Sequence, residues 1–263
     1  MRQKHPFFII AILFIFLLSF SSCSSELRTE NKETVPAEDE YTGKLTFDGR
    51  RYTYTGMPED ISADGDRLII KKNGIYLVSG RLSEGRISVE CVGSVALVFG
   101  GFEGSSSHGA VIERSDGGEL QISALPDTVN ILRTQAGASD KSGTLPAGCV
   151  LSSGRLVMGG IGRLTVSAPN SSGAVCSDLL ITSGELSISC SDYGIWAKNS
   201  ARVIGGTISF TSANIGIYSH KDTYNNGKID ILTPCRIRSL CRTSTFQTNG
   251  TLTVTATDIE EST

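Results

Sequence analysis

The sequence predicts an all-β chain that folds as a single-stranded, right-handed parallel β-helix, a solenoid with coils of about 22 residues. Glycine is in excess, with 29 of 263 residues or about 11%, against about 7% in average proteins. Short segments recur every 22 residues, and apolar and polar side chains alternate within them. The glycines also argue against long helices, since each internal glycine costs a helix about 1 kcal/mol relative to alanine.

The clearest repeat consists of four segments that each begin with a glycine. Their sequences are GRLTVSA, GELSISC, GTISFTS and GTLTVTA, and they begin at Gly162, Gly184, Gly206 and Gly250. The glycines are therefore 22, 22 and 44 residues apart. Because successive side chains of a strand point to opposite faces, alternation assigns one apolar set to the interior: Leu164, Val166, Leu186, Ile188, Ile208, Phe210, Leu252 and Val254.

A second set of strands runs alongside the first. It begins at five further glycines, with spacings of 39, 25, 21 and 22 residues: Gly109, Gly148, Gly173, Gly194 and Gly216. Alternation predicts that these residues face the interior: Ala110, Ile112, Cys149, Leu151, Ala174, Cys176, Ile195, Ala197, Ile217 and Ser219. The residues between them are expected to face outward, namely Val111, Val150, Val175, Trp196 and Tyr218.

A coil of this size cannot close a core of its own. Stacking the coils about 4.8 Å apart satisfies both the backbone hydrogen bonds and the apolar faces, which is the arrangement of a parallel β-helix. Right-handedness is the default for parallel crossovers. A β-sandwich is the structural alternative, but it does not require a near-constant coil length. We expect the solenoid over 42–256, loops at 134–146 and 220–227, and a polar tail over 257–263.

The first residues have the features of an export signal. A basic start with Arg2 and Lys4 is followed by the apolar run 7–18 and by small residues up to Cys23. The apolar run is shorter than the roughly 20 residues that span a membrane. The segment resembles the lipobox of bacterial lipoproteins, of Bacteroidetes type, which implies a lipoprotein signal peptide over 1–22 and lipid attachment at Cys23. A plain secretory signal is the alternative.

Residues 23–41 predict a flexible acidic tether. Between residues 24 and 41 the chain has six acidic and two basic side chains and almost no large apolar one. Such a segment cannot bury enough surface to offset the entropy lost on ordering. Together with the resemblance to a lipoprotein signal, it predicts a protein outside the cytoplasm, anchored by lipid to the cell envelope at the outer membrane or cell surface.

The other cysteines and the overall charge constrain the chemistry. Six cysteines remain in the body of the chain, and they show no zinc-binding spacing: Cys91, Cys149, Cys176, Cys190, Cys235 and Cys241. The inward positions of Cys149, Cys176 and Cys190 favour free thiols in the core, with disulfides between coils as the alternative. The 24 basic residues against 27 acidic ones give a net charge of −3, which argues against a nucleic-acid partner.

The order of these motifs resembles a bacterial family of right-handed parallel β-helix proteins, the carbohydrate-binding domain-containing proteins, which form a pectate-lyase-like solenoid. The resemblance covers about 68–256 and rests on the segment Leu68–Val89, on Val95–Gly100, and on the glycine motifs at Gly109, Gly206 and Gly250. It implies a protein that binds polysaccharide, with calcium as a further ligand.

The turns between coils depart from the pattern of this family, which has acid-rich turns suited to Ca2+. The matching turns here are SDYGI at 191–195 and ANIGI at 213–217, and only Asp192 is acidic. No cofactor is therefore certain. A calcium site would draw on the oxygen-bearing side chains Asp192, Asp222, Asn225 and Asn226, but turns also select these residue types for backbone reasons.

The outward face suggests a binding site. Trp196 and Tyr218 are 22 residues apart, so we expect them to be neighbours in successive coils, with Lys198 and His220 two positions further along the same strands. Two aromatic rings beside two basic groups suit the stacking of a sugar ring and the pairing of its carboxylate. The alternative is that a loop or a second molecule covers both rings.

We therefore predict a protein that binds polysaccharide without converting it. An adhesive or structural surface protein that binds another protein is the alternative. A polysaccharide lyase or hydrolase is less favoured, because such chemistry needs clustered carboxylates or a metal site with a basic residue nearby. His108 and His220 stand in different coils, with no acidic partner evident from the spacing.

Overall fold

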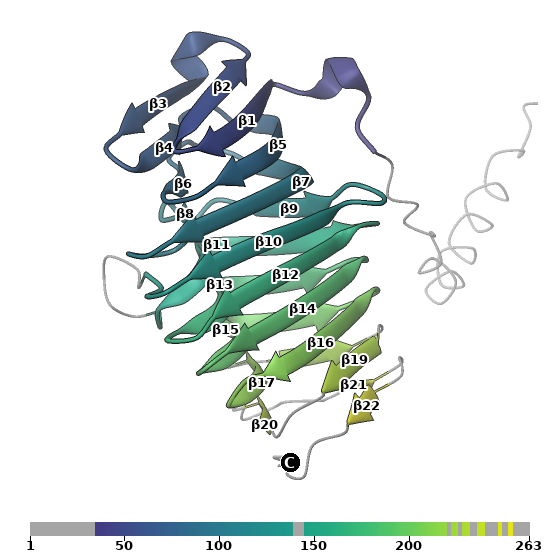
Figure 1. The fold of residues 1–263 in the computed structure, drawn as a ribbon. Helices are drawn as coiled ribbons and strands as arrows, with labels where there is room; N and C mark the ends of the chain where they lie inside the picture. The colour runs from purple at the N-terminus through teal and green to yellow at the C-terminus, as the bar shows by residue number, and fades with distance from the viewer. Residues whose placement is uncertain are drawn as a thin grey trace, which may run out of the picture. The chain divides into compact units, whose positions relative to one another are not determined.

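The computed structural model describes residues 35–138 and 145–219, together with the backbone of five later strands. This part of the chain is all-β, with one large and mostly parallel sheet (Figure 1). Two single-turn 3-10 helices, η1 (Glu38–Glu40) and η2 (Pro58–Asp60), are its only helical elements. No helix among these residues is long and apolar enough to cross a membrane. The predicted signal peptide and Cys23 lie outside the described residues, and η1 lies within the predicted tether.

The strands form three columns in which each strand pairs in parallel with the equivalent strand of the next coil. The first column contains β4 (Arg67–Ile70), β6 (Arg86–Val89), β8 (Ile112–Arg114), the first halves of β11 (Gly148–Gly160), β13 (Ser172–Ile181) and β15 (Tyr193–Val203), then β17 (Ile215–Ser219) and β20 (Arg236–Ser239). Several strands serve two columns because they bend at a break in register, as β13 and β15 do between Cys176 and Asp178.

The second and third columns complete each coil. The second contains the first halves of β5 (Gly74–Leu82) and β7 (Val95–Ser106), then β9 (Leu120–Ala124), the second halves of β11, β13 and β15, β18 (Asp222–Asn225) and β21 (Gln247–Thr248). The third contains the second halves of β5 and β7, then β10 (Val129–Thr134), β12 (Arg163–Ala168), β14 (Glu185–Cys190), β16 (Thr207–Ser212), β19 (Lys228–Ile231) and β22 (Leu252–Val254).

The first coils differ from the uniform solenoid that the sequence predicts from residue 42. There β1 (Gly43–Gly49) pairs with β2 (Arg51–Thr55) in an antiparallel hairpin, and β3 (Ile61–Asp64) pairs with β4 in a second one. These hairpins stand at the N-terminal end of the stacked strands (Figure 1). Their strands carry no 22-residue repeat, so the periodicity gave no signal for them.

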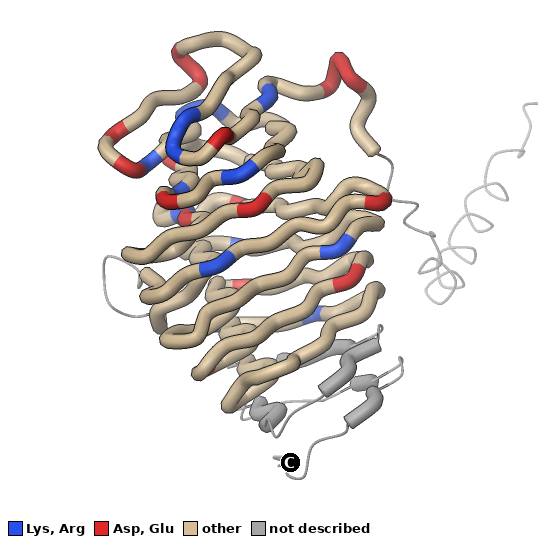
Figure 2. Tube along the Cα trace, in the orientation of Figure 1, with Lys and Arg blue, Asp and Glu red and all other residues tan. Residues whose placement is uncertain are grey.

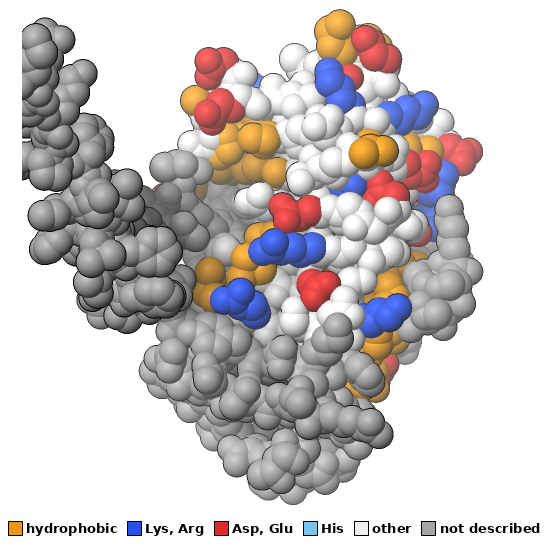
Figure 3. Space-filling model, turned by 180° about the vertical axis from the view of Figure 1, so that it is seen from behind, with side chains coloured by type: hydrophobic (Ala, Val, Ile, Leu, Met, Phe, Trp, Pro, Cys, Tyr) orange, Lys and Arg blue, Asp and Glu red, His pale blue; other side chains and the backbone are white. Residues whose placement is uncertain are grey.

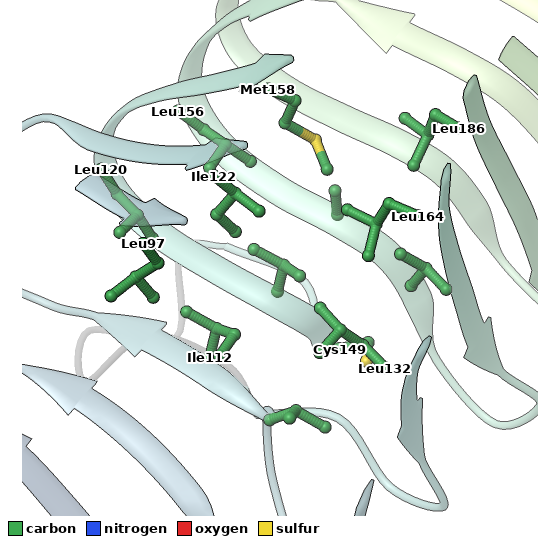
Figure 4. Close-up of a cluster of buried hydrophobic side chains, with 14 of the residues drawn as sticks. Leu97, Ile112, Leu120, Ile122, Leu132, Cys149, Leu156, Met158, Leu164 and Leu186 are labelled. Carbon is green, nitrogen blue, oxygen red and sulfur yellow. The ribbon is translucent and has the colours of Figure 1, made fainter. Parts of the chain in front are cut away.

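The core lies between the three columns. Side chains from different columns point toward one another there, as Ile112, Leu120 and Leu132 do in Figure 4. Alternation predicted this interior correctly on the third column, where Leu164, Val166 and Ile188 are all buried. The corner glycines that start these strands are constrained: Gly184 and Gly206 have φ of +84° and +85°, a left-handed conformation that side chains disfavour.

On the first column, four predicted orientations are wrong. Leu151 was expected to face inward and Val150 outward, but the ladder pairs Val150 with the inward Ala174, and Leu151 with the outward Val175. One coil earlier, Ile112 on β8 is inward as predicted, but the two residues before this strand are exchanged: Val111 joins the main core and Ala110 joins a small outer cluster. The ladder pairs Gly148 with Ser172 rather than with Gly173, so aligning the glycines shifted the strand by one residue.

Four of the body cysteines lie in the described part, and all four are free thiols: Cys91, Cys149, Cys176 and Cys190. This agrees with the prediction of core thiols. Burial raises the pKa of Cys149 to about 12, so this thiol is protonated and unreactive at neutral pH. Cys235 and Cys241 lie outside the described residues.

Candidate functional site

The predicted aromatic pair lies on the outer side of the first column. Trp196 on β15 and Tyr218 on β17 are partners in the parallel ladder. Their ring centroids are 5.9 Å apart and their planes differ by 13°, so the rings stack. A third ring belongs to Tyr193, whose centroid is 5.3 Å from that of Tyr218 at an interplanar angle of 56°. The three rings together are called the aromatic platform below.

Alternation along β15 explains why Trp196 faces outward. Its neighbours Ile195 and Ala197 are both fully buried in the main core. Trp196 and Tyr218 are half-buried, and Lys198, two residues further along the strand, is exposed on the same outer face. The predicted fourth member, His220, lies outside the described residues.

A covered apolar patch adjoins the platform on the same column. In the preceding coil the ladder partner of Trp196 is Val175, and one coil earlier the partner of Val175 is Leu151. Both side chains face outward, yet both are fully buried. They form a small cluster with Ala110 and Leu145, and Ala138 and Trp196 pack against it. Ala138 also pairs with Gly148 in an antiparallel bridge. The described ends of the predicted 134–146 loop therefore cover this face over two coils, and Trp196 lies at the edge of the covered area.

The geometry leaves part of each ring accessible. Two nearly parallel rings with centroids 5.9 Å apart are offset, so they overlap only in part. The apolar faces and edges that remain can contact the C–H groups of a sugar ring, and phenol hydroxyls can exchange hydrogen bonds with its hydroxyls. The exposed ammonium group of Lys198 adds a site for an anionic or hydroxyl group beside the rings.

Asp192 stands at the turn that precedes the platform. Its backbone carbonyl accepts hydrogen bonds from the amides of Asn214 and Ile215, at 3.0 and 3.2 Å, and its carboxylate accepts one from the Ser172 hydroxyl at 3.4 Å. Burial raises the pKa of this carboxyl, although the Ser172 bond opposes the shift. These contacts give Asp192 a structural function in joining successive coils.

The predicted calcium ligands are distributed over two columns. Asp192 precedes the first half of β15, whereas Asp222 and Asn225 lie on β18, which pairs with the second half of β15. The backbone therefore does not bring Asp192 next to the other two, and Asn226 lies outside the described residues. Within 35–138 and 145–219, no three His, Cys, Asp or Glu side chains form a cluster suited to a metal ion. The calcium site stays a prediction.

Sequence reasoning missed Tyr193 and a polar corner beside Lys198. Tyr193 falls in a predicted turn, where strand alternation assigns no face. At the corner, Asp178 accepts hydrogen bonds from the Asn199 amide at 2.9 Å and from the Ser200 hydroxyl at 2.7 Å. The 22-residue spacing of Asp178 and Ser200 was the available signal. Both oxygens of this carboxylate are engaged, so the corner after Lys198 is held in place.

Comparison with known proteins identifies the family. Residues 64–263 match the model of the family described as carbohydrate-binding domain-containing protein. The chain belongs to this family. The carbohydrate-binding domain includes the aromatic platform and nearly all of the parallel coils, and it begins at the end of β3.

The fold of this carbohydrate-binding domain also has a solved counterpart. A structure of the polysaccharide lyase-like protein from C. thermocellum, a gadolinium derivative, is similar with a TM-score of 0.65 and 21% sequence identity. The similarity covers 83% of this chain and 98% of that one. At this identity it supports the solenoid-like fold alone. A search of curated proteins gave no significant match.

Proposed function

We propose that the protein is an exported, lipid-anchored, right-handed parallel β-helix that binds polysaccharide along its outer face and does not cleave it. The ligand-binding residues are Trp196, Tyr218, Lys198 and His220. The observation that carries the proposal is the stack of Trp196 on Tyr218, half-exposed beside Lys198, in a member of a carbohydrate-binding family. Membership in the family indicates the class of ligand, and the stacked rings indicate where on the surface it binds.

The parallel ladder gives the platform a shape that suits a polymer. Equivalent residues of successive coils lie about 4.8 Å apart along the stack. The rings of Trp196 and Tyr218 therefore form a short row that runs from coil to coil, and Lys198 lies beside this row. A row of this kind contacts an extended chain of sugar units along its length, whereas a single free sugar meets only part of it.

The described side chains support binding over catalysis. Among them, Ser107, His108 and Glu84 bring a hydroxyl, an imidazole and a carboxylate together. The Ser107 hydroxyl lies 2.8 Å from Nδ1 of His108 and donates to the Glu84 carboxylate at 2.9 Å. In a Ser-His-Asp relay the carboxylate holds the imidazole instead. Here the Glu84 carboxylate accepts hydrogen bonds from the Ser107 hydroxyl and also from the Ser107 backbone amide, at 2.9 Å. These bonds stabilise the turn and do not orient the imidazole.

The N-terminal segment supports export and anchoring. The basic start, the apolar run and Cys23 fit a lipoprotein signal of Bacteroidetes type, and the acidic segment that follows fits a tether. A lipid-anchored solenoid on a tether of about 20 residues would hold its outer face toward polysaccharide at the outer membrane or cell surface. Two or more acyl chains suffice for stable anchoring.

The test is a glycan array followed by titration in solution. Wild-type protein is expected to retain one class of polysaccharide, and Trp196→Ala should lower its affinity by roughly 30-fold, which corresponds to about 2 kcal/mol at a buried aromatic contact. Trp196 is the only tryptophan of the chain, so a change in its emission on adding the polysaccharide would place the ligand at the platform.

Two matched variants control the test. Val129→Ala truncates an exposed apolar side chain on the third column, and Lys71→Gln removes an exposed lysine charge far along the sequence from Lys198. Both should retain wild-type affinity, whereas Lys198→Gln should weaken binding. Unchanged retention by folded Trp196→Ala would refute the site. Retention of an envelope protein by the wild type, with no glycan retained, would favour the adhesive alternative.

A further inference from the structure

A separate cavity lies at the N-terminal end of the solenoid, where the two hairpins meet the first coils. It has a volume of about 190 Å³. Residues of β1 to β6 and of the turns between them line it, so it combines segments from 47 to 86. The family match begins at residue 64, so one wall of this cavity, with Phe47, Arg50 and Tyr52, lies outside the carbohydrate-binding domain. Family membership therefore assigns no function to it.

Three arginines line the cavity, and two of them are stacked. Arg67 on β4 and Arg86 on β6 are direct partners in the parallel ladder, and Arg50 lies in the β1–β2 turn. Like charges placed opposite each other on neighbouring strands are destabilising. Charge is also concentrated in this region: there are twenty charged residues between 43 and 119 but seven between 145 and 219 (Figure 2).

The protein's own carboxylates satisfy these arginines only in part. Arg67 contacts Asp64 at 3.4 Å and Glu90 at 3.3 Å, and Arg86 contacts Asp66 at 3.3 Å. These distances are longer than the 2.7–2.9 Å of strong charge-assisted hydrogen bonds. The buried Nε of Arg86 has no hydrogen-bond partner at all. A buried donor without an acceptor is unfavourable, and an anion in the cavity would provide one.

The rest of the lining is apolar and aromatic. Phe47, Leu68 and Leu82 are buried and give the cavity an apolar part. Tyr52 is exposed, and the centroid of its ring lies 6.2 Å from that of Phe47, with an angle of 52° between the planes. An apolar wall next to arginine donors suits a ligand with two parts, a ring or short hydrocarbon body and an anionic group.

We propose that this cavity binds a small monocarboxylate that carries a single ring, with its carboxylate on Arg50, Arg67 and Arg86 and its ring against Tyr52. Arg67 and Arg86 have partner carboxylates in Asp64, Glu90 and Asp66, whereas Arg50 forms no ion pair with a described residue, so its charge is available to match one negative charge on the ligand. The planar guanidinium fork fits a carboxylate. The volume is below the roughly 300–1,000 Å³ of common ligand pockets, so one ring fills it and a polymer does not.

The ring can come from a sugar acid or from an aromatic acid, and calorimetric titration of the full-length protein distinguishes the two. Glucuronate and benzoate are the acidic probes, and glucose and benzamide are their neutral counterparts. We expect at least one acid to bind about tenfold or more tightly than its neutral counterpart, because only the acid accepts charge-assisted hydrogen bonds from the arginines. Equal binding of acid and neutral probe, or tighter binding of inorganic phosphate than of either acid, would overturn the proposal.

Variants place the ligand in the cavity. Arg50→Gln should weaken binding of the acid about tenfold, and Arg51→Gln should not, because Arg51 is an exposed neighbour that does not line the cavity. Arg50 has an exposed side chain in a turn, so its replacement should leave the melting temperature unchanged. Tyr52→Leu should weaken the binding of the acid that carries an aromatic or sugar ring, but not the binding of acetate, which has no ring. Equal affinity of the two arginine variants would refute this location.

This site is independent of the aromatic platform. Trp196→Ala should bind the monocarboxylate with wild-type affinity, and Arg50→Gln should retain polysaccharide as the wild type does. Loss of carboxylate binding in Trp196→Ala would show that the small acid occupies the platform and would overturn the second site. Failure of the polysaccharide test with intact carboxylate binding would refute the proposed function and leave this inference standing.

Discussion

Arg114 is the largest side chain that the described core buries completely. Its Nη1 donates to the carbonyl of Glu119 at 2.6 Å, and its Nη2 donates to the carbonyls of Cys91 and Gly93 at 2.8 and 2.6 Å. Its Nε donates to the Asp116 carboxylate at 2.6 Å. A buried charge is tolerated only when it is paired and hydrogen-bonded, and here one guanidinium fastens the turns of two coils.

Such buried polar residues mark the limit of sequence reasoning at this scale. Alternation from Ile112 puts Arg114 on the inward face, but arginine is rarely buried, so composition argues against that position. Asn130 is a second case: it is fully buried and accepts hydrogen bonds from the amides of Gly101 and Phe102 at 2.9 Å each. Several of their partners are backbone groups 21 to 29 residues away in the sequence, which no spacing rule identifies.

We predict that Asp116→Asn lowers stability at neutral pH by about 1–2 kcal/mol, because it removes a charge-assisted hydrogen bond from a partly exposed carboxylate. Burial alone would raise the pKa of Asp116, but hydrogen bonds from Arg114 and from the Gly118 amide outweigh it and hold the pKa below 3.8. A lowered pKa in the folded state means that the stabilisation is complete above about pH 4 and is lost as the pH falls through the folded-state pKa.

Urea denaturation at pH 7 and at pH 3 measures this difference. The difference in free energy of unfolding between wild type and Asp116→Asn should be smaller at pH 3, where the wild-type carboxyl also begins to protonate. Asp48→Asn removes an exposed carboxylate and should match the wild type at both values. An equal difference in free energy of unfolding at both pH values would show that the negative charge of Asp116 does not stabilise the buried Arg114.

At the scale of strands, alternation predicted the inward residues correctly only where one face of the strand is apolar and the other is polar. On β12, β14 and β16 the outward residues are polar or charged, so the inward set was clear from the sequence. Seen from the opposite side in Figure 3, much of the described surface is white, the colour of the backbone and of side chains that are neither hydrophobic nor charged. On β11 both faces of Gly148–Ser152 are buried, one by the core and one by the described ends of the 134–146 loop. Without a polar face, a shift of one residue could not be detected.

The third column provides the sharpest test of the inward assignment. Ile188 on β14 is fully buried in the core, and Ser187 beside it faces outward. We predict that Ile188→Asp unfolds the protein, because an unpaired buried carboxylate costs several kcal/mol out of a typical total stability of about 5–15 kcal/mol. Ser187→Asp places the same charge one residue away and should remain folded. Circular dichroism and the urea midpoint check both variants, and a cooperative, soluble Ile188→Asp would contradict the assignment.

At the scale of the whole molecule, repetition made the coils predictable and hid the features that interrupt them. The 22-residue spacing predicted Trp196 and Tyr218 as partners, and the ladder has that register. The antiparallel hairpins and the cavity beside them have no repeat, so they could be found only in the structure. Polysaccharide binding on the late coils and carboxylate binding at the N-terminal end would thus follow from two different parts of the sequence.

The proposed location of the protein depends on Cys23, and its replacement tests the anchor. We predict that Cys23→Ser abolishes incorporation of radiolabelled palmitate in the producing bacterium and moves the protein from the membrane fraction to the soluble one, because lipid chains provide the membrane affinity. Cys91→Ser changes a half-buried thiol of the solenoid and should keep both label and membrane association. A wild type without label would favour the plain secretory signal and a freely diffusing polysaccharide-binding protein, and label that persists in Cys23→Ser would show that another residue carries the lipid.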